Sequence, residues 1–240
     1  VADVSNVGIA CVTTCTTITG VVSSDTQYGL AQSPYCIAPS LQIPTGVTVT
    51  FEPGTSVSGG TIVVQGTLKV AGNAASRVAL SNVGIMPAGL TDKNHLIDIN
   101  FADIEGGSFS LSTGSGAYGS FNLTDSRVTG ASSIYVWYPR GNSLIARNSF
   151  VKTGGISFGT DSFATSLTID NNYFEGWTTQ YAIESWASYS RIASTKGNTF
   201  VLEKGYAGVL PAGYNAAQLD LRGNYFGTTD LALIGQSIFD

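Results

Sequence analysis

Hydrophobic and polar residues alternate along most of this chain. The alternation recurs in repeated sequence segments, here called phrases, that end with similar residues. In the phrase at 166–174, Leu167 and Ile169 alternate with Thr168 and Asp170 before the chain reads Asn-Asn-Tyr-Phe. Alternation with a period of two predicts strands, because successive side chains of a strand point to opposite faces. No long stretch shows the three- and four-residue spacing of a helix, so the pattern predicts an all-β protein.

The phrase recurs at nearly constant intervals. Four copies end at a phenylalanine, and the steps between them are 24, 26 and 26 residues. Two weaker copies precede these, with steps of 24 and 22 residues to the next copy. The copies end at Ile104, Val128, Phe150, Phe174, Phe200 and Phe226. A fixed period in this range predicts a solenoid, and short strands within each repeat predict one coil of a parallel β-helix per copy. At this coil length the chain would make about eight to ten coils.

Stacking of the coils places equivalent residues directly above one another. The residues that end each copy should then form an internal stack that is largely aromatic. An asparagine precedes the terminal phenylalanine by two positions in the last four copies, at Asn148, Asn172, Asn198 and Asn224. Stacked amides can hydrogen-bond from coil to coil, so we expect a structural asparagine ladder.

Three stretches resemble known β-helix proteins. Residues 44–54, Pro-Thr-Gly-Val-Thr-Val-Thr-Phe-Glu-Pro-Gly, and 66–72, Gly-Thr-Leu-Lys-Val-Ala-Gly, resemble the opening coils of bacterial right-handed parallel β-helix proteins of the pectate-lyase-like superfamily. Residues 223–230, Gly-Asn-Tyr-Phe-Gly-Thr-Thr-Asp, are similar to the end of such domains in secreted and cell-surface proteins. The resemblance implies a single right-handed parallel β-helix. It implies no single activity, because the superfamily includes pectin and alginate enzymes, tailspike-like proteins and non-catalytic surface modules.

A solenoid exposes strand edges at both ends and therefore needs caps. Residues 1–40 are the predicted N-terminal cap, 41–227 the coils and 228–240 a short C-terminal cap, all within one domain. The last segment has the best helix-like spacing in the chain, which predicts a short turn or helix over the final coil.

All three cysteines lie in the first 36 residues, at Cys11, Cys15 and Cys36. Two cysteines four residues apart are hard to bridge in an extended chain, so we expect Cys36 to pair with Cys11 or Cys15. A disulfide is typical of an oxidising environment, and it predicts a secreted or cell-surface protein. The lone histidine, His95, has no neighbours at ligand spacing, so neither a metal site nor a cofactor is predicted.

Charged residues make up only 11% of the chain, and the formal net charge is −5 with no basic run. This balance argues against a nucleic-acid partner. No apolar stretch reaches membrane-spanning length. The chain begins at Val1 and not at a methionine. This is consistent with a proteolytically processed protein, with a sequence cut at an arbitrary position, or with part of a larger surface protein.

Function must come from outward residues and loops, because the repeated positions are core. A second strand of the late coils aligns between copies, and the segments that follow it should emerge on one side and stack. They carry aromatic and charged residues at Trp137, Tyr138, Arg140, Asp161, Phe163, Glu184, Trp186, Tyr189, Arg191 and Tyr214. Aromatic rings stack on the apolar faces of sugars, and charged groups bind hydroxyls or uronate carboxylates. These residues predict a carbohydrate-binding face, and the alternative is that they only cover corners of the solenoid.

An enzymatic use of the same face is also conceivable. A glycosidase needs two carboxylates across a cleft, and Asp161 and Glu184 are the candidate pair in adjacent coils. A uronate lyase needs a base, for which Arg140 or Arg191 are the candidates. A single histidine and the lack of a Gly-x-Ser-x-Gly motif argue against a nucleophilic triad. The sequence therefore predicts a structural, adhesive or carbohydrate-binding module, with a polysaccharide lyase or glycoside hydrolase as the alternative.

Overall fold

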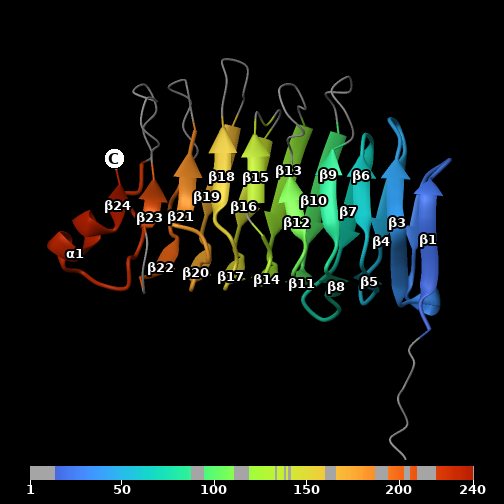
Figure 1. Ribbon diagram of the computed structural model, residues 1–240, viewed down its shortest axis with the longest axis horizontal. Helices are drawn as coiled ribbons and strands as arrows, with labels where there is room; N and C mark the ends of the chain where they lie inside the picture. The colour runs from blue at the N-terminus through green and yellow to red at the C-terminus, as the bar shows by residue number, and fades with distance from the viewer. Residues whose placement is uncertain are drawn as a thin grey trace, which may run out of the picture.

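Short parallel strands wind the chain into a solenoid, with three strands in each turn (Figure 1). The computed structural model describes residues 14–87, 95–110, 119–132, 134–137, 139, 142–159, 166–186, 194–202, 206–209 and 220–239. Within them, the strands from β4 to β21 make about six full turns, and the strands before and after belong to incomplete turns. The predicted single parallel β-helix is confirmed, but the estimate of eight to ten coils exceeds the number of full turns.

The strands form three faces. The first sheet consists of β2 (Thr26–Tyr28), β4 (Thr48–Phe51), β7 (Thr67–Ala71), β10 (His95–Asn100), β13 (Gly119–Thr124), β16 (Asn142–Ala146) and β19 (Ser166–Asp170). The second sheet consists of β5 (Ser56–Ser58), β8 (Val78–Ser81), β11 (Ala102–Glu105), β14 (Arg127–Thr129), β17 (Ser149–Val151), β20 (Tyr173–Glu175) and β22 (Thr199–Val201). The third sheet consists of β6 (Thr61–Val64), β9 (Gly84–Pro87), β12 (Ser108–Ser110), β15 (Ile134–Trp137), β18 (Ile156–Gly159), β21 (Tyr181–Ser185), β23 (Tyr206–Val209) and β24 (Ile238–Phe239).

The second and third sheets join at the N-terminal end. There the long strand β3 (Tyr35–Ile43) pairs with β5 through its first residues and with β6 through its last. On its other side β3 pairs with β1 (Thr16–Val21), and a 3-10 turn, η1 (Leu30–Gln32), precedes it. Strand β3 also crosses the predicted boundary between cap and coils at residue 40, so residues 35–40 already pair as solenoid strand.

The core lies inside the three faces, and its centre in the late coils is the predicted aromatic stack. The four phenylalanine rings that end the late copies stack with centroids 5.0, 5.1 and 5.5 Å apart along the series. Val128 pairs with Phe150, and Ile104 pairs with Val128, so the earlier copies extend the same row. All six side chains are buried, which confirms that the most repeated residues of the chain serve packing.

Four successive turns bend sharply between the first and second sheets, at a non-glycine residue with left-handed backbone. Phe101, Asp125, Arg147 and Asn171 occupy this corner with φ between 48° and 58°. Residues other than glycine seldom adopt this backbone conformation, because their Cβ atom approaches the following carbonyl oxygen. Two of the corner residues also form an ion pair, since Arg147 donates to both carboxylate oxygens of Asp125 at 2.8 and 2.6 Å. This hydrogen-bonded guanidinium lowers the pKa of the Asp125 carboxyl.

The asparagine ladder follows the corner directly. The backbone N–H groups of Asn148, Asn172 and Asn198 donate to the side-chain oxygen of the next asparagine at 3.0, 2.9 and 2.8 Å. Each side-chain amide of these three also donates to that same oxygen and to a backbone carbonyl of the preceding coil. Buried polar groups are stable only when they are bonded, and the ladder bonds them in every late coil. The predicted structural role of the asparagines is confirmed.

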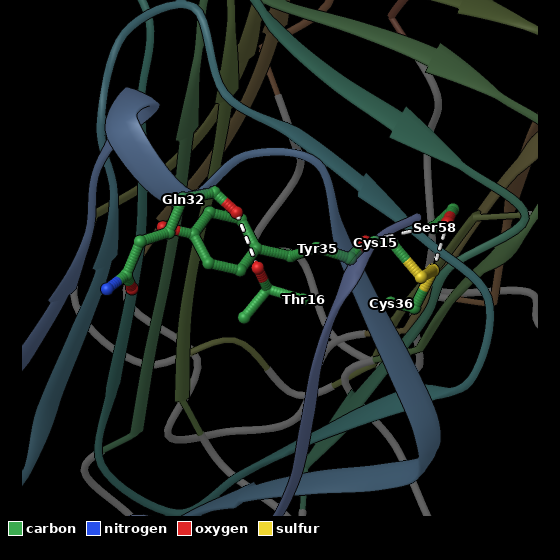
Figure 2. Close-up of a disulfide and its surroundings, with 6 residues drawn as sticks. All are labelled: Cys15, Thr16, Gln32, Tyr35, Cys36 and Ser58. Atoms are coloured by element: carbon green, nitrogen blue, oxygen red, sulfur yellow. Dashed lines mark hydrogen bonds between the residues drawn. A yellow bond between two sulfur atoms is a disulfide. The ribbon is translucent and has the colours of Figure 1, made fainter. Parts of the chain in front are cut away.

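A disulfide ties the first strand to the solenoid. Cys15, just before β1, is bonded to Cys36 in β3, so one of the two predicted pairings is confirmed (Figure 2). Next to it, the Thr16 hydroxyl donates to the Gln32 carbonyl at 2.7 Å, and the Sγ atom of Cys36 lies 3.5 Å from the Ser58 hydroxyl. The third cysteine, Cys11, is outside the described residues.

The opposite end carries the short helix α1 (Leu231–Gln236), which the spacing of the last segment predicted (Figure 1). Asp230 caps it by accepting from the backbone N–H of Ala232 at 2.9 Å. Ile234 of the helix and Ile238 of β24 pack against the core, and β24 pairs with β23. No helix among the described residues is long and apolar enough to cross a membrane.

Candidate functional site

Four strands of the third sheet lead into the segments that carry the predicted functional residues. Ile134 of β15 pairs with Ile156 of β18, which pairs with Ile183 of β21, and Ile183 pairs with Gly208 of β23. The four strands therefore pair in successive coils, and their ends follow one edge of the solenoid (Figure 1). This register brings the start of each predicted segment to the same side.

Most of the predicted site residues themselves lie outside the described residues. This holds for Tyr138, Arg140, Asp161, Phe163, Tyr189, Arg191 and Tyr214, and for the side chain of Trp137, whose backbone ends β15. The predicted pair of carboxylates, Asp161 and Glu184, therefore has no measured separation. Glu184 and Trp186 are the two predicted residues whose surroundings are described.

Glu184 lies on the outer face of the third sheet in a row with two hydroxyl-bearing residues. Tyr135 pairs with Ser157, and Ser157 pairs with Glu184, so the three occupy equivalent positions in successive coils. The Ser157 hydroxyl donates to Oε2 of Glu184 at 2.9 Å. Ser157 is only 1% exposed although it points outward, whereas the Tyr135 ring is 43% exposed. Larger side chains therefore cover the serine and fix the carboxylate above it.

Tyr181 supplies much of this cover. A Cβ added to Gly155 would lie 2.7 Å from the Tyr181 ring, so the ring rests directly on the glycine backbone of the neighbouring coil. Burial raises the pKa of the Tyr181 phenol, and a hydrogen bond to Glu184 and the charge of Glu184 raise it further. The Tyr181 phenol therefore lies beside the Glu184 carboxylate, within hydrogen-bonding reach. We call Tyr135, Ser157, Tyr181 and Glu184 the hydroxyl–carboxylate cluster.

Two more aromatic residues border the cluster. Tyr206 pairs with Tyr181 in the next coil, and it is half-buried. The backbone N–H of Trp186 donates to the Phe158 carbonyl at 2.7 Å, which continues the strand pairing one residue past β21. Trp186 is also half-buried, at the point where the chain leaves the sheet.

Sequence reasoning missed three members of the cluster. Tyr135, Ser157 and Tyr181 lie within strands, as Glu184 does, whereas the sequence predicted functional residues in the segments after the strands. The signal was present, because aligning Ile134 with Ile156 and Ile183 places the next residue of each strand on the outer face. The dependence on Gly155 could not be read from the sequence, since it rests on the position of a ring from another coil.

The described residues give no sign of a metal centre. Among them, no group of three or more His, Cys, Asp or Glu side chains is arranged to hold an ion. His95 begins β10, and it is 2% exposed. Its ring occupies the space that a Cβ on Gly119 would need, so the histidine is part of the packing between adjacent coils.

Comparison of the chain with protein-family models, with curated proteins and with solved structures gave no match. The resemblance to β-helix proteins is thus supported by the architecture, a parallel β-solenoid. What the outer faces of this solenoid do has to be argued from their own chemistry.

Proposed function

We propose that this protein is a carbohydrate-binding β-solenoid and that its ligand lies on the outer face of the third sheet, over the hydroxyl–carboxylate cluster. The observation that carries the proposal is the Glu184 carboxylate, held by the Ser157 and Tyr181 hydroxyls beside the exposed Tyr135 ring. An exposed aromatic ring next to an oriented carboxylate has the chemistry that sugar recognition needs. The ring covers an apolar face of a sugar, and the carboxylate accepts from its hydroxyls.

The geometry supports binding by a rigid surface. The cluster is built on strands rather than on loops, so its side chains are positioned by the ladder of backbone hydrogen bonds. The Glu184 carboxylate has two protein donors, and a carboxylate has about four lone-pair sites, so it can still accept from a ligand. Trp186, which directly follows β21, is half-buried and would extend the proposed surface along the edge.

Catalysis at this face is the second candidate, and the contact between Tyr181 and Glu184 favours it. The structure places a phenol O–H and a carboxylate side by side on the outer face of the third sheet. A proton donor beside a proton acceptor is the basic requirement for hydrolysis or β-elimination of a polysaccharide. In this candidate Asp161 and Arg191, which the sequence analysis selected, would complete the reaction centre.

The setting proposed for either activity is outside the cytoplasm. The Cys15–Cys36 disulfide supports it, because structural disulfides persist mainly in oxidising compartments. We propose a secreted or cell-surface module, either as a free protein or as part of a larger surface protein.

A glycan array followed by calorimetry tests the binding proposal on three proteins: wild type, Tyr135→Ala and Glu184→Gln. We expect wild type to bind a glycan and each variant to weaken the binding by about tenfold, since one aromatic or charge-assisted contact contributes about 1.4 kcal/mol. Met86→Ala is the matched control, because Met86 is a partly exposed residue of the same outer row on β9.

Two other outcomes have clear meanings. Ultraviolet-absorbing unsaturated products or new reducing ends, lost in Glu184→Gln, would favour the enzyme. Wild-type binding that neither Tyr135→Ala nor Glu184→Gln weakens would reject the cluster as the binding site.

A further inference from the structure

The outer face of the second sheet carries a row of aligned side chains that the proposed function does not use. Strands β11, β14, β17, β20 and β22 lie side by side along the solenoid (Figure 1). Because they pair in register, the equivalent outward residue of each coil falls in one line parallel to the long axis. Starting at β11, this line runs through Asp103, Arg127, Ser149, Tyr173, Thr199 and Tyr225.

The C-terminal part of the row is aromatic. Tyr173 is 36% exposed and Tyr225 is 53% exposed, and the smaller Thr199 lies between them. Two strand spacings separate the tyrosines, which is about 9.6 Å. The Tyr173 hydroxyl donates to Oε2 of Glu175 at 2.8 Å, so a carboxylate lies beside the first ring. The Tyr173 and Tyr225 rings therefore lie along the axis, with the Thr199 hydroxyl between them and the Glu175 carboxylate beside the first ring.

The other end of the row is hollowed. A groove of about 360 Å³ crosses β8, β11 and β14, where Ala79 and Ser81 leave space between larger side chains. Asp103 stands in this groove, with Nε of Arg77 at 2.7 Å and a guanidinium nitrogen of Arg127 at 3.8 Å. The neighbouring Glu105 has no hydrogen-bond or ion-pair partner for its side chain among the described residues. The groove thus presents carboxylates and a guanidinium to a ligand.

We propose that this face binds a neutral, linear polysaccharide that lies along the solenoid axis. Its sugar rings stack on Tyr173 and Tyr225, and the end of the polysaccharide beyond Tyr173 lies in the groove. An extended β-linked chain presents the same ring face at every second sugar. Two rings two strands apart, separated by a small threonine, suit alternate sugars of such a chain. Aromatic rings cover the apolar sugar faces, and carboxylates accept from the hydroxyls.

The charges on this face select against an anionic chain. The carboxylates of Asp103, Glu105 and Glu175 lie along it, and the formal net charge of the protein is −5. Arg77 and Arg127 lie beside Asp103 and neutralise it, so Glu105 and Glu175 carry the remaining negative charge of this face. A polysaccharide of uronates would meet the like charges of these two glutamates, whereas a neutral chain avoids this repulsion.

The experiment is calorimetric titration of the full chain with cellohexaose and mannohexaose as neutral probes and with hexagalacturonate as the anionic probe. We expect at least one neutral probe to bind and hexagalacturonate to bind at least tenfold more weakly at this face. Tyr225→Ala and Tyr173→Ala should each weaken the binding of the neutral probe by about tenfold. Tyr225→Phe should keep the affinity for this probe within about threefold, because stacking needs only the aromatic ring. Both tyrosines are exposed, and an unchanged melting temperature checks that the variants are folded.

Tyr135→Ala, on the third sheet, separates this proposal from the proposed function. Loss of neutral-probe binding in the Tyr225 and Tyr173 variants, with Tyr135→Ala unchanged, supports the second-sheet surface whatever the third sheet does. Loss in Tyr135→Ala alone overturns this inference and leaves the proposed function standing. Absence of binding to both neutral probes, or stronger binding of hexagalacturonate that depends on Tyr225, also overturns it.

Discussion

Asn172 shows how much one residue of the ladder holds together. Its side-chain oxygen accepts from the backbone and the side chain of Asn148, and its amide donates to Ile145 and Asn198. Replacing it with alanine leaves these buried groups without their partner, and each unsatisfied group costs about 1–3 kcal/mol. We expect Asn172→Ala to lower the free energy of unfolding by at least about 3 kcal/mol, measured by chemical denaturation.

The adjacent Asn171 provides the control for this prediction. It is an exposed corner residue with φ of 58°, a conformation that glycine adopts without penalty. Asn171→Gly should therefore change the free energy of unfolding by less than about 1 kcal/mol. Equal effects of the two substitutions would contradict the structural role assigned to the ladder.

At the residue scale, the sequence predicted positions where the same residue type repeats. The phenylalanine stack and the asparagine ladder recur in every late copy, so stacking alone assigns their places. The left-handed corner also repeats, but its residue type changes, and at Phe101 and Arg147 it could not be foreseen because neither residue type favours positive φ. Tyr181 was missed for a different reason, since its position depends on Gly155 of another coil.

Strand β1 depends on the disulfide more than any other element does. It lies at the end of the stack and pairs on one side with β3, while the Cys15–Cys36 bond ties its start to the same strand. Removing a crosslink with a separation of 21 residues costs about 3 kcal/mol in chain entropy. In Cys15→Ser/Cys36→Ser we expect hydrogen exchange of the β1 amides to quicken by at least about tenfold.

Amides of β7, in the middle of the first sheet, serve as the reference within the same protein. Their exchange should stay unchanged, because β4 and β10 flank β7 on both sides. Unchanged protection of β1 in the double variant would show that pairing alone holds the strand. Uniform loss of protection in β1 and β7 would show instead that the whole solenoid depends on the bond.

At the element scale, the alternation predicted the strands, and the cysteine spacing reduced the pairing to two options. It could not choose between Cys11 and Cys15, because either can approach Cys36 along an extended chain. The structure selects Cys15: Thr17 of β1 is the pairing partner of Cys36, and the Cα atom of Cys15 lies 5.6 Å from that of Cys36. The short helix α1 was predictable from its spacing and has a regular cap at Asp230.

The whole molecule is a stack of equivalent turns, so removing one turn should leave a working solenoid. Deletion of the 24 residues 81–104 joins Leu80 to Glu105, and both lie in positions that already pair across coils. We expect this variant to fold, with a strand-rich circular dichroism spectrum and one cooperative melting transition. The hydroxyl–carboxylate cluster lies in later coils, so binding that depends on Tyr135 should persist.

Deletion of 81–103 is the matched control, because it removes one residue fewer. The residues after the junction would then be shifted by one position, so Ile104, which faces inward, would take the outward position of Glu105. We expect aggregation or loss of the cooperative transition. Equal folding of the two deletions would contradict a strict register between coils.

The disulfide also decides how the solenoid would respond to mechanical tension. If the protein is anchored through the segment before residue 14, a pulling force enters the described chain next to Cys15. The covalent bond passes this force directly to Cys36 in β3, which pairs with β1, β5 and β6. The terminal strand β1 is then bypassed and cannot be peeled away first, so the load is borne where the second and third sheets meet.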